Sequence, residues 1–317
     1  MARTSAARRP RAVAGLLALV AAVAVLTSCI PMPPNSYVSG LFANGEGPNV
    51  VRAETFMGLG AWWDVYDWSP TFTNGAARLG VADVDRLASA GVQTLYIQTA
   101  TYRHPATVLD PTRLSAIVAR ARARKVKVVG WYLPQFLDAG NDLHRMVAAV
   151  RLGLDGYAVD IESTDNPNVP ARSLVLVNEM RFLRTAFPNL PLAAVPVTPV
   201  LWEELNRSWW PSFPYREVAR FSDAWMPMAY WTYRAEGTTW RDPYRYTAES
   251  VTRLRRNTGV PYLPVHPIGG LSSLMSTADA DAMNRAMTDT YAIGGSLYDD
   301  VSTPAGLWPS LRQFRRT

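Results

Sequence analysis

The chain has 317 residues, of which 48% are hydrophobic and 18% are charged. This composition supplies enough apolar surface for a full globular core and excludes a coiled coil or a disordered chain. The formal net charge is +6, but it falls to +2 without Arg3, Arg8, Arg9 and Arg11, which precede a segment that we expect to be removed. The other arginines are spread along the chain and form no basic run, so we expect no nucleic-acid partner.

The first 28 residues have the layout of a secretory signal peptide, with an arginine-rich start and an apolar run over residues 12–26. This run is shorter than the roughly 20 residues that span a bilayer. The segment Leu26-Thr27-Ser28-Cys29 resembles the bacterial lipobox, and Cys29 is the only cysteine. We therefore expect a lipid anchor on Cys29 at the extracytoplasmic face of a bacterial membrane. The alternative is an ordinary signal peptide followed by an unpaired cysteine.

Three regions are expected along the chain: a lipoprotein signal peptide over residues 1–28, a flexible tether over residues 29–50, and a folded body over residues 51–317. The tether carries prolines, glycines and asparagines and shows no apolar period.

In the body, short apolar runs alternate with amphipathic segments, which is the pattern of parallel βα units. Strands are predicted at 57–63, 92–99, 126–132, 156–161, 192–196, 224–230, 262–266 and 295–298. Helical periods fall at 81–90, 114–121, 143–150, 172–187, 246–257 and 278–291.

This alternation predicts an α/β fold of the (β/α)8 TIM-barrel type. The alternative is a doubly wound open sheet, but no glycine-rich phosphate fingerprint follows the first predicted strand.

In such barrels the chemistry lies at the C-terminal strand ends, which makes the residues there candidates for substrate contact. They are Trp63, Asp64, Gln98, Trp131, Tyr132, Asp160, Glu162, Tyr230, Trp231, His266, Tyr298 and Asp299. Aromatic faces stack on sugar rings while carboxylates and amides bind hydroxyls, so this mixture favours a polysaccharide or oligosaccharide partner. We expect no cofactor. The three histidines lack the spacing of metal ligands, so we also expect no metal.

Asp160 and Glu162 are the strongest local signal. Because side chains alternate along a strand, both point to the same face, about 6.5 Å apart along the strand. Two carboxylates at this spacing repel each other, and one then holds a proton near neutral pH, as a general acid for glycosidic cleavage requires. The alternative role for them is capping a helix or pairing with an arginine.

The segment Asp155-Gly156-x-x-x-Asp160-x-Glu162 resembles the strand-four Asp-Gly-x-Asp-x-Asp-x-Glu motif of glycoside hydrolase family 18, the chitinases and related N-acetylglucosaminidases. Residues 226–230 and 294–298 are similar to that family's sixth and final strands. The chain departs from the family pattern at Ala158, where the family has an Asp, at Trp231, where an Asp is usual, and at Tyr298, where a Trp is usual.

The resemblance implies that Glu162 protonates the leaving oxygen. It also implies that Asp160 orients the acetamido group of the substrate as an internal nucleophile and that Tyr230 binds the acetamido carbonyl. The Asp-x-Glu pair together with Asp64 also resembles family 25 lysozymes, which cleave peptidoglycan. A third possibility is another barrel glycosidase, with Asp299 or Asp300 as its second carboxylate.

Three functions therefore remain open. The first is a lipid-anchored glycoside hydrolase acting on a cell-envelope or environmental polysaccharide. The second is a non-catalytic carbohydrate-binding lipoprotein on a decayed hydrolase barrel, and the third is a structural envelope protein. The segments 209–211 and 233–246 add aromatic residues that could rim a groove or only shield a connection.

Overall fold

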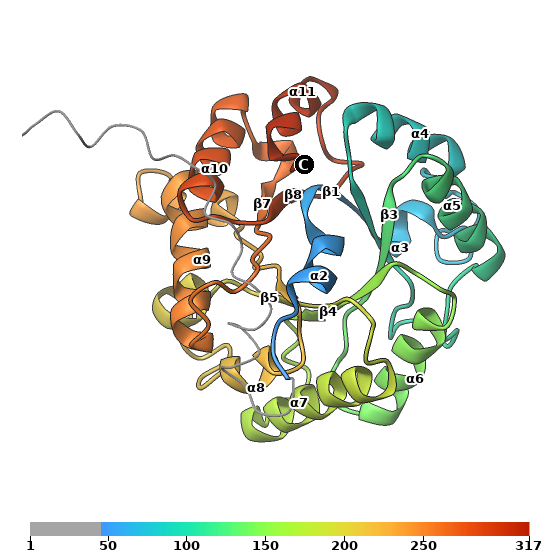
Figure 1. Cartoon of the computed structure of the whole chain (residues 1–317), viewed down its shortest axis with the longest axis horizontal. Coiled ribbons are helices and arrows are strands. Elements are labelled where there is room, and N and C mark those ends of the chain that lie inside the picture. Colours follow the sequence, from blue (N-terminus) through green and yellow to red (C-terminus); the bar gives the residue numbers. More distant parts are fainter. Residues whose placement is uncertain (1–45, 317) are drawn as a thin grey trace, which may run out of the picture. The chain divides into compact units, whose positions relative to one another are not determined.

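The computed structural model describes residues 46–316, and its centre is a sheet of eight parallel strands with helices packed around it (Figure 1). The strands are β1 (Gly58–Trp63), β2 (Thr94–Gln98), β3 (Lys127–Tyr132), β4 (Gly156–Ile161), β5 (Leu192–Pro196), β6 (Ala224–Trp225), β7 (Ile268–Leu271) and β8 (Gly294–Tyr298). The α-helices are α2 (Val50–Ala53), α3 (Val65–Trp68), α4 (Val81–Ala90), α5 (Pro111–Ala123), α6 (Ala139–Val150), α7 (Val169–Ala186), α8 (Tyr215–Ala219), α9 (Pro243–Thr258), α10 (Thr277–Asp289) and α11 (Trp308–Leu311).

The sheet closes on itself as a barrel. The strands are hydrogen-bonded in the order β6-β5-β4-β3-β2-β1-β8-β7. The remaining seam, between β6 and β7, is joined by parallel bridges from Trp225 to Val265 and from Met228 to Ile268. The prediction of a (β/α)8 barrel is therefore confirmed.

The seventh strand is the main error in the predicted elements. It was expected at 262–266, but the ladder begins only at Ile268. Pro261, Pro264 and Pro267 lack the backbone N–H that a ladder needs, so the predicted run makes only an isolated bridge. The observed strand contains Gly269 and Gly270, which weaken its sequence signal.

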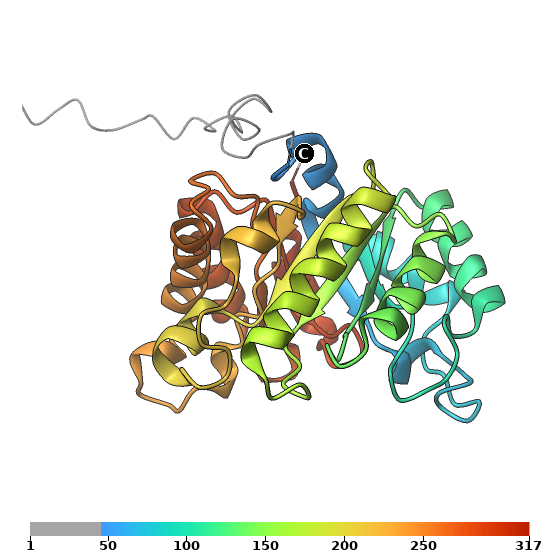
Figure 2. The ribbon, with the colours of Figure 1, turned by 90° about the horizontal axis from the view of Figure 1, so that it is seen from below.

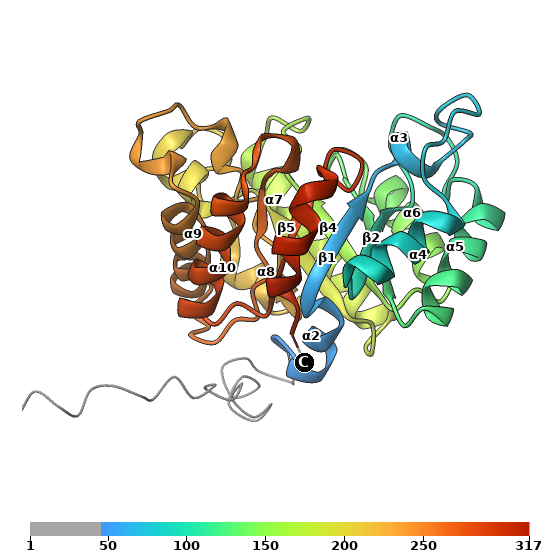
Figure 3. The ribbon, with the colours of Figure 1, turned by 90° about the horizontal axis from the view of Figure 1, so that it is seen from above.

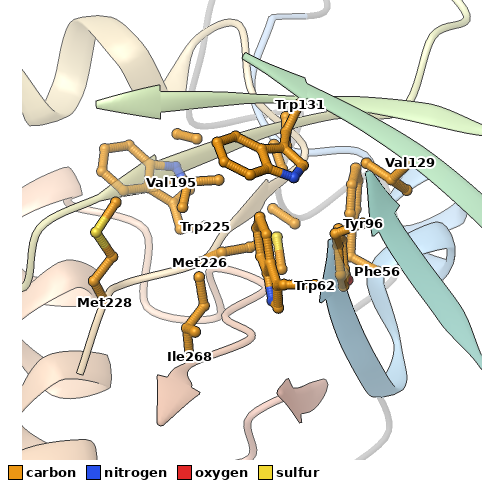
Figure 4. Packing of buried hydrophobic residues seen from close by; sticks show 14 of the residues in the cluster. Phe56, Trp62, Tyr96, Val129, Trp131, Val195, Trp225, Met226, Met228 and Ile268 are labelled. Carbon is orange, nitrogen blue, oxygen red and sulfur yellow. The ribbon is translucent and has the colours of Figure 1, made fainter. Parts of the chain in front are cut away.

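Aromatic side chains fill much of the barrel interior (Figure 4). Trp62 stacks on Tyr96 with ring centroids 4.5 Å apart and meets the edge of Trp131 at 5.8 Å. The Trp62 Nε1 donates to Ser296 Oγ at 2.8 Å, so the buried indole N–H is satisfied. These rings close the barrel axis, so the interior is a packed core and not a pore.

The two ends of the barrel differ. Helix α2, which precedes β1, lies at the same end as the C-terminal end of the described chain, whereas α3, which follows β1, lies at the opposite end (Figures 2 and 3). The C-terminal strand ends, where chemistry is expected, are therefore at the α3 end.

The folded body extends a few residues ahead of Val50. Gly47 N donates to Arg220 O at 2.7 Å, and Glu46 pairs with Arg220 at 2.6 Å. The predicted signal peptide, Cys29 and most of the predicted tether lie outside the described residues. No helix within residues 46–316 is both long and apolar enough to cross a membrane.

Candidate active site

A cavity of about 450 Å³ lies at the α3 end of the barrel, lined by the C-terminal ends of the strands and the loops that follow them. Its walls include Asp64, Gln98, Trp131, Asp160, Glu162, Tyr230 and Tyr298, all predicted from the sequence. The structure thus brings together residues from β2, β3, β4 and β8 and from the loops after β1 and β6. A cavity of this volume suits a small ligand or part of a larger one.

Asp160 is the last inward-facing residue of β4, and Glu162 follows one residue after the strand ends. Asp160 is 8% exposed, and one of its carboxylate oxygens is shut off from solvent without a hydrogen-bond partner. Burial raises the pKa of Asp160 well above its usual range, and the charge of Glu162 raises it further. Burial also raises the pKa of Glu162. The pair is therefore expected to hold a proton at neutral pH.

Tyr230 lies near both carboxyl groups. Burial raises the pKa of its phenol, and the charges of Glu162 and Asp160 raise it further. Its hydroxyl therefore remains a neutral hydrogen-bond donor at any physiological pH.

Asp64 follows β1, which is three strands away from β4 in the ring, and caps α3. It accepts a hydrogen bond from Tyr298 OH at 2.9 Å and another from Tyr66 N at 2.7 Å. Burial raises its pKa despite these bonds. Tyr298 therefore presents a polar edge to the cavity and is held by a carboxylate.

Asp64, Asp67 and Asp299 each offer an oxygen within 4.8 Å of the others, so within residues 46–316 this cluster has the spacing that cation ligands require. Burial together with the charges of Asp64 and Asp299 raises the pKa of Asp67 to about 7. Arg78 approaches Asp67 at 3.7 Å.

Gln98 links β2 to the start of α3. Its side-chain carbonyl accepts from Val65 N at 3.1 Å, and its backbone carbonyl accepts from Trp68 Nε1 at 3.0 Å. Gln98 therefore fixes the loop that carries Asp64, besides lining the cavity.

Trp209 is a cavity residue that the sequence pattern does not single out, although its aromatic segment is a candidate rim. It lies in the connection between β5 and β6, lines the cavity and donates from Nε1 to the backbone carbonyl of Glu162 at 3.0 Å. Only its place in an aromatic segment after a predicted strand end could have suggested this contact.

The other predicted contact residues, Trp63, Tyr132, Trp231, His266 and Asp299, do not line the cavity. Trp63 donates to Asp300 Oδ2 at 2.8 Å, and Tyr132 donates to Asp142 Oδ1 at 2.7 Å. Both are fully buried. Their neighbours Trp62 and Trp131 contact each other inside the barrel, so Trp63 and Tyr132 point outward, as strand alternation requires.

Trp231 begins a short 3-10 turn after Tyr230 and is buried beside the glycines of β7. Asp299 accepts from Ser302 N at 2.8 Å within its own loop. Asp300, the other carboxylate considered, is paired with Arg86 at 2.6 Å.

His266 does not end a strand at the cavity. Its Nδ1 donates to Phe56 O at 2.7 Å, and its Nε2 accepts from Ser296 Oγ at 2.9 Å. Burial lowers its pKa to about 4, so the ring is neutral. Phe56 precedes β1, which places His266 toward the opposite end of the barrel interior.

Comparison of the sequence with models of known protein families yields no match, and comparison with curated protein sequences yields none either.

Solved structures do match. The spore cortex-lytic enzyme SleL of Bacillus cereus has a TM-score of 0.57 and 10% identity, with 82% of this chain and 75% of that chain covered. A chitinase from Chromobacterium violaceum has a TM-score of 0.55 and 11% identity, with 81% and 98% covered. A class V chitinase from Pseudomonas fluorescens has a TM-score of 0.57 and 10% identity, with 81% and 99% covered. At these identities the likeness establishes the fold: the chain is an α/β protein of the (β/α)8 barrel type.

Proposed function

We propose that this protein is a glycoside hydrolase that cleaves O-glycosidic bonds of a polysaccharide by acid catalysis from β4. The observation that carries the proposal is the pair Asp160, which is buried, and Glu162, which is half-buried, in one cavity, with raised pKa values and no arginine or lysine paired to either. A structural ion pair is excluded for them within residues 46–316, where each lacks a basic partner within 4.0 Å. Keeping two such groups together and largely shielded from water costs stability, which a role in catalysis explains.

Glu162 is assigned as the general acid. It is the more exposed member of the pair, and it lies just past the end of the strand, where it can reach a glycosidic oxygen. The bond from Trp209 to its backbone carbonyl holds this residue in place. Protonation of the leaving oxygen then assists departure of the sugar.

Asp160 and Tyr230 are assigned the role of positioning a nucleophile that the substrate itself carries. In a sugar with a 2-acetamido group, Tyr230 donates to the carbonyl oxygen and Asp160 binds the N–H, which orients the oxygen toward the anomeric carbon. Glu162 is the one glutamate among the described residues that line the cavity, and this assistance explains why a second is not needed. The named neighbours that are chitinases support a substrate of this chemistry.

The test is to incubate purified protein with chitin oligomers, peptidoglycan fragments and neutral polysaccharides and to detect new reducing ends by mass spectrometry. Wild type is compared with Glu162→Gln and with Glu217→Gln, an exposed glutamate on α8 as matched control. New reducing ends produced by wild type and by Glu217→Gln, but not by Glu162→Gln, support a hydrolase. Binding without any product from wild type would contradict it and favour the carbohydrate-binding alternative.

We further propose that the protein is anchored by a lipid on Cys29 at the extracytoplasmic face of the membrane. The supporting observation is the lipobox-like segment at the end of an apolar run, with Cys29 as the only cysteine.

Replacing Cys29 by serine is expected to move the protein from the membrane fraction to the soluble or secreted fraction, because the serine cannot accept the lipid. Immunoblots of fractionated cells and the intact mass of the purified protein measure this. Unchanged fractionation of Cys29→Ser would contradict the anchor.

A further inference from the structure

Two arginines, Arg103 and Arg234, line the cavity without a carboxylate partner. Neither guanidinium has an Asp or Glu oxygen within 4.0 Å among residues 46–316. Arg103 instead donates to two neutral phenols, Tyr66 at 2.7 Å and Tyr102 at 3.1 Å. These tyrosines orient the guanidinium but do not compensate its charge.

Arg234 has a donor with no acceptor. Its Nε is shut off from solvent and makes no hydrogen bond, while its guanidinium carbon lies 6.0 Å from the Tyr246 ring centre. A buried N–H without a partner is destabilising, so a ligand atom that accepts from it would remove this penalty.

The two arginines lie at opposite sides of the barrel mouth. Arg103 follows β2 and Arg234 follows β6, and these strands are four positions apart in the ring of eight. Strand β4, which carries Asp160, lies midway between them. The cavity therefore has a cation on each side of the carboxyl pair.

These cations do not serve to balance the carboxyl pair. Burial is the leading cause of the raised pKa of Asp160 and of Glu162, and no arginine lowers either value. The positive charge at the rim is thus available to a ligand. An Arg guanidinium is planar and matches the oxygens of a carboxylate or phosphate with two parallel hydrogen bonds.

We propose that the cavity binds an anionic glycan, with Arg103 and Arg234 pairing with carboxylate or phosphate substituents on the two sides of the Asp160–Glu162 pair. This inference rests on the proposed function for the site and adds the substrate class. The glycan carries acidic groups on sugars that flank the bond above β4.

The test measures binding by calorimetry to the full-length protein carrying Glu162→Gln, so that the ligand is not consumed. The probes are neutral N-acetylglucosamine oligomers, peptide-free oligomers of N-acetylglucosamine and N-acetylmuramic acid, oligogalacturonate, and a phosphodiester-linked sugar polymer. Each is measured with Arg103→Gln, with Arg234→Gln, with both together, and with Arg151→Gln. Arg151 is an exposed control that follows α6 and precedes β4, at the other end of the barrel.

Affinity for at least one acidic probe is expected to exceed that for the neutral oligomers, and to fall about tenfold or more in the double variant. The affinity for the neutral probe should change less than about twofold in the double variant. Arg151→Gln should leave the affinities for the acidic and the neutral probes unchanged. Added salt should weaken only the acidic probe, because rim charges are screened. Arg234→Lys should recover only part of the loss, since a lysine lacks the planar pair of donors.

The carboxylate and phosphate probes distinguish the two sources of negative charge. Equal loss of neutral and acidic binding in the double variant, or tighter binding of the neutral probe by the parent protein, would overturn this inference. Cleavage of neutral oligomers by wild type, with no preference for acidic ones, would also overturn this inference. The proposed hydrolase activity would then still hold. If wild type binds an acidic glycan in an arginine-dependent way but cleaves none of the probes, the proposed hydrolase activity is refuted. The inference of an anionic ligand would then still hold.

Discussion

Replacing Glu162 by glutamine is expected to lower kcat on the cleaved glycan by about 100- to 10,000-fold, which is the usual contribution of a general acid. The amide keeps the size of the side chain but has no acidic proton to transfer. KM should change much less than kcat, because the lost interaction is made mainly in the transition state. Initial rates over a range of substrate concentrations separate the two constants.

The pH profile checks the same assignment. Burial raises the pKa of Glu162, so the acid form persists above the range of an ordinary glutamate and the rate is lost as the pH rises through that raised pKa. Asp160→Asn removes the coupled carboxyl and should shift this alkaline limb. Full activity of Glu162→Gln would refute the assignment of Glu162. A normal rate in the exposed control Glu217→Gln is required for either result to be interpreted.

Replacing Glu179 by methionine is expected to stabilise the protein at neutral and alkaline pH. Glu179 lies on α7, is fully buried, and has no hydrogen-bond partner on either carboxylate oxygen. Burial raises its pKa to about 9, and the nearby charge of Asp142 contributes. The folded state therefore keeps a proton that the unfolded chain releases, so folding is opposed increasingly as the pH rises from about 4.5 toward 9.

The sign of this effect determines the measurement. The contribution of a group with a raised pKa is fully present below its unfolded value and is lost as the pH rises through its folded value. The advantage of Glu179→Met over wild type in free energy of unfolding should thus grow by about 4 kcal/mol between pH 5 and pH 8. Urea unfolding at both pH values measures it. Parallel pH profiles for the two proteins would contradict the prediction, and Glu217→Gln should follow wild type throughout.

Glu179 also shows why a buried acid is not enough to identify a site. It has a raised pKa, as Asp160 and Glu162 do, but it lies on a helix and lines no part of the cavity. Asp160 and Glu162 differ because two carboxyl groups and Tyr230 meet at the mouth of the barrel. Position at the strand ends, together with burial, separates the candidate site from a structural acid.

Much of the barrel could be predicted from the sequence because its strands and helices have clear local periods. The predicted runs at 156–161 and 192–196 coincide with β4 and β5, and the helix at 81–90 coincides with α4. The seventh strand could not be predicted in this way, since prolines break the apolar run and glycines occupy the true strand. Its position is set by pairing with β8, which is a contact between distant parts of the chain.

The sequence by itself determined the parallel βα order and the presence of Asp160 and Glu162 on one face of a strand, because both follow from local periodicity. Only the tertiary structure decided which of the neighbours Trp131 and Tyr132 faces the cavity: Trp131 lines it, while Tyr132 points to Asp142. It also brought Trp209, Arg103 and Arg234 to the site. These residues lie on loops after different strands, and their meeting depends on barrel closure, which no local pattern encodes.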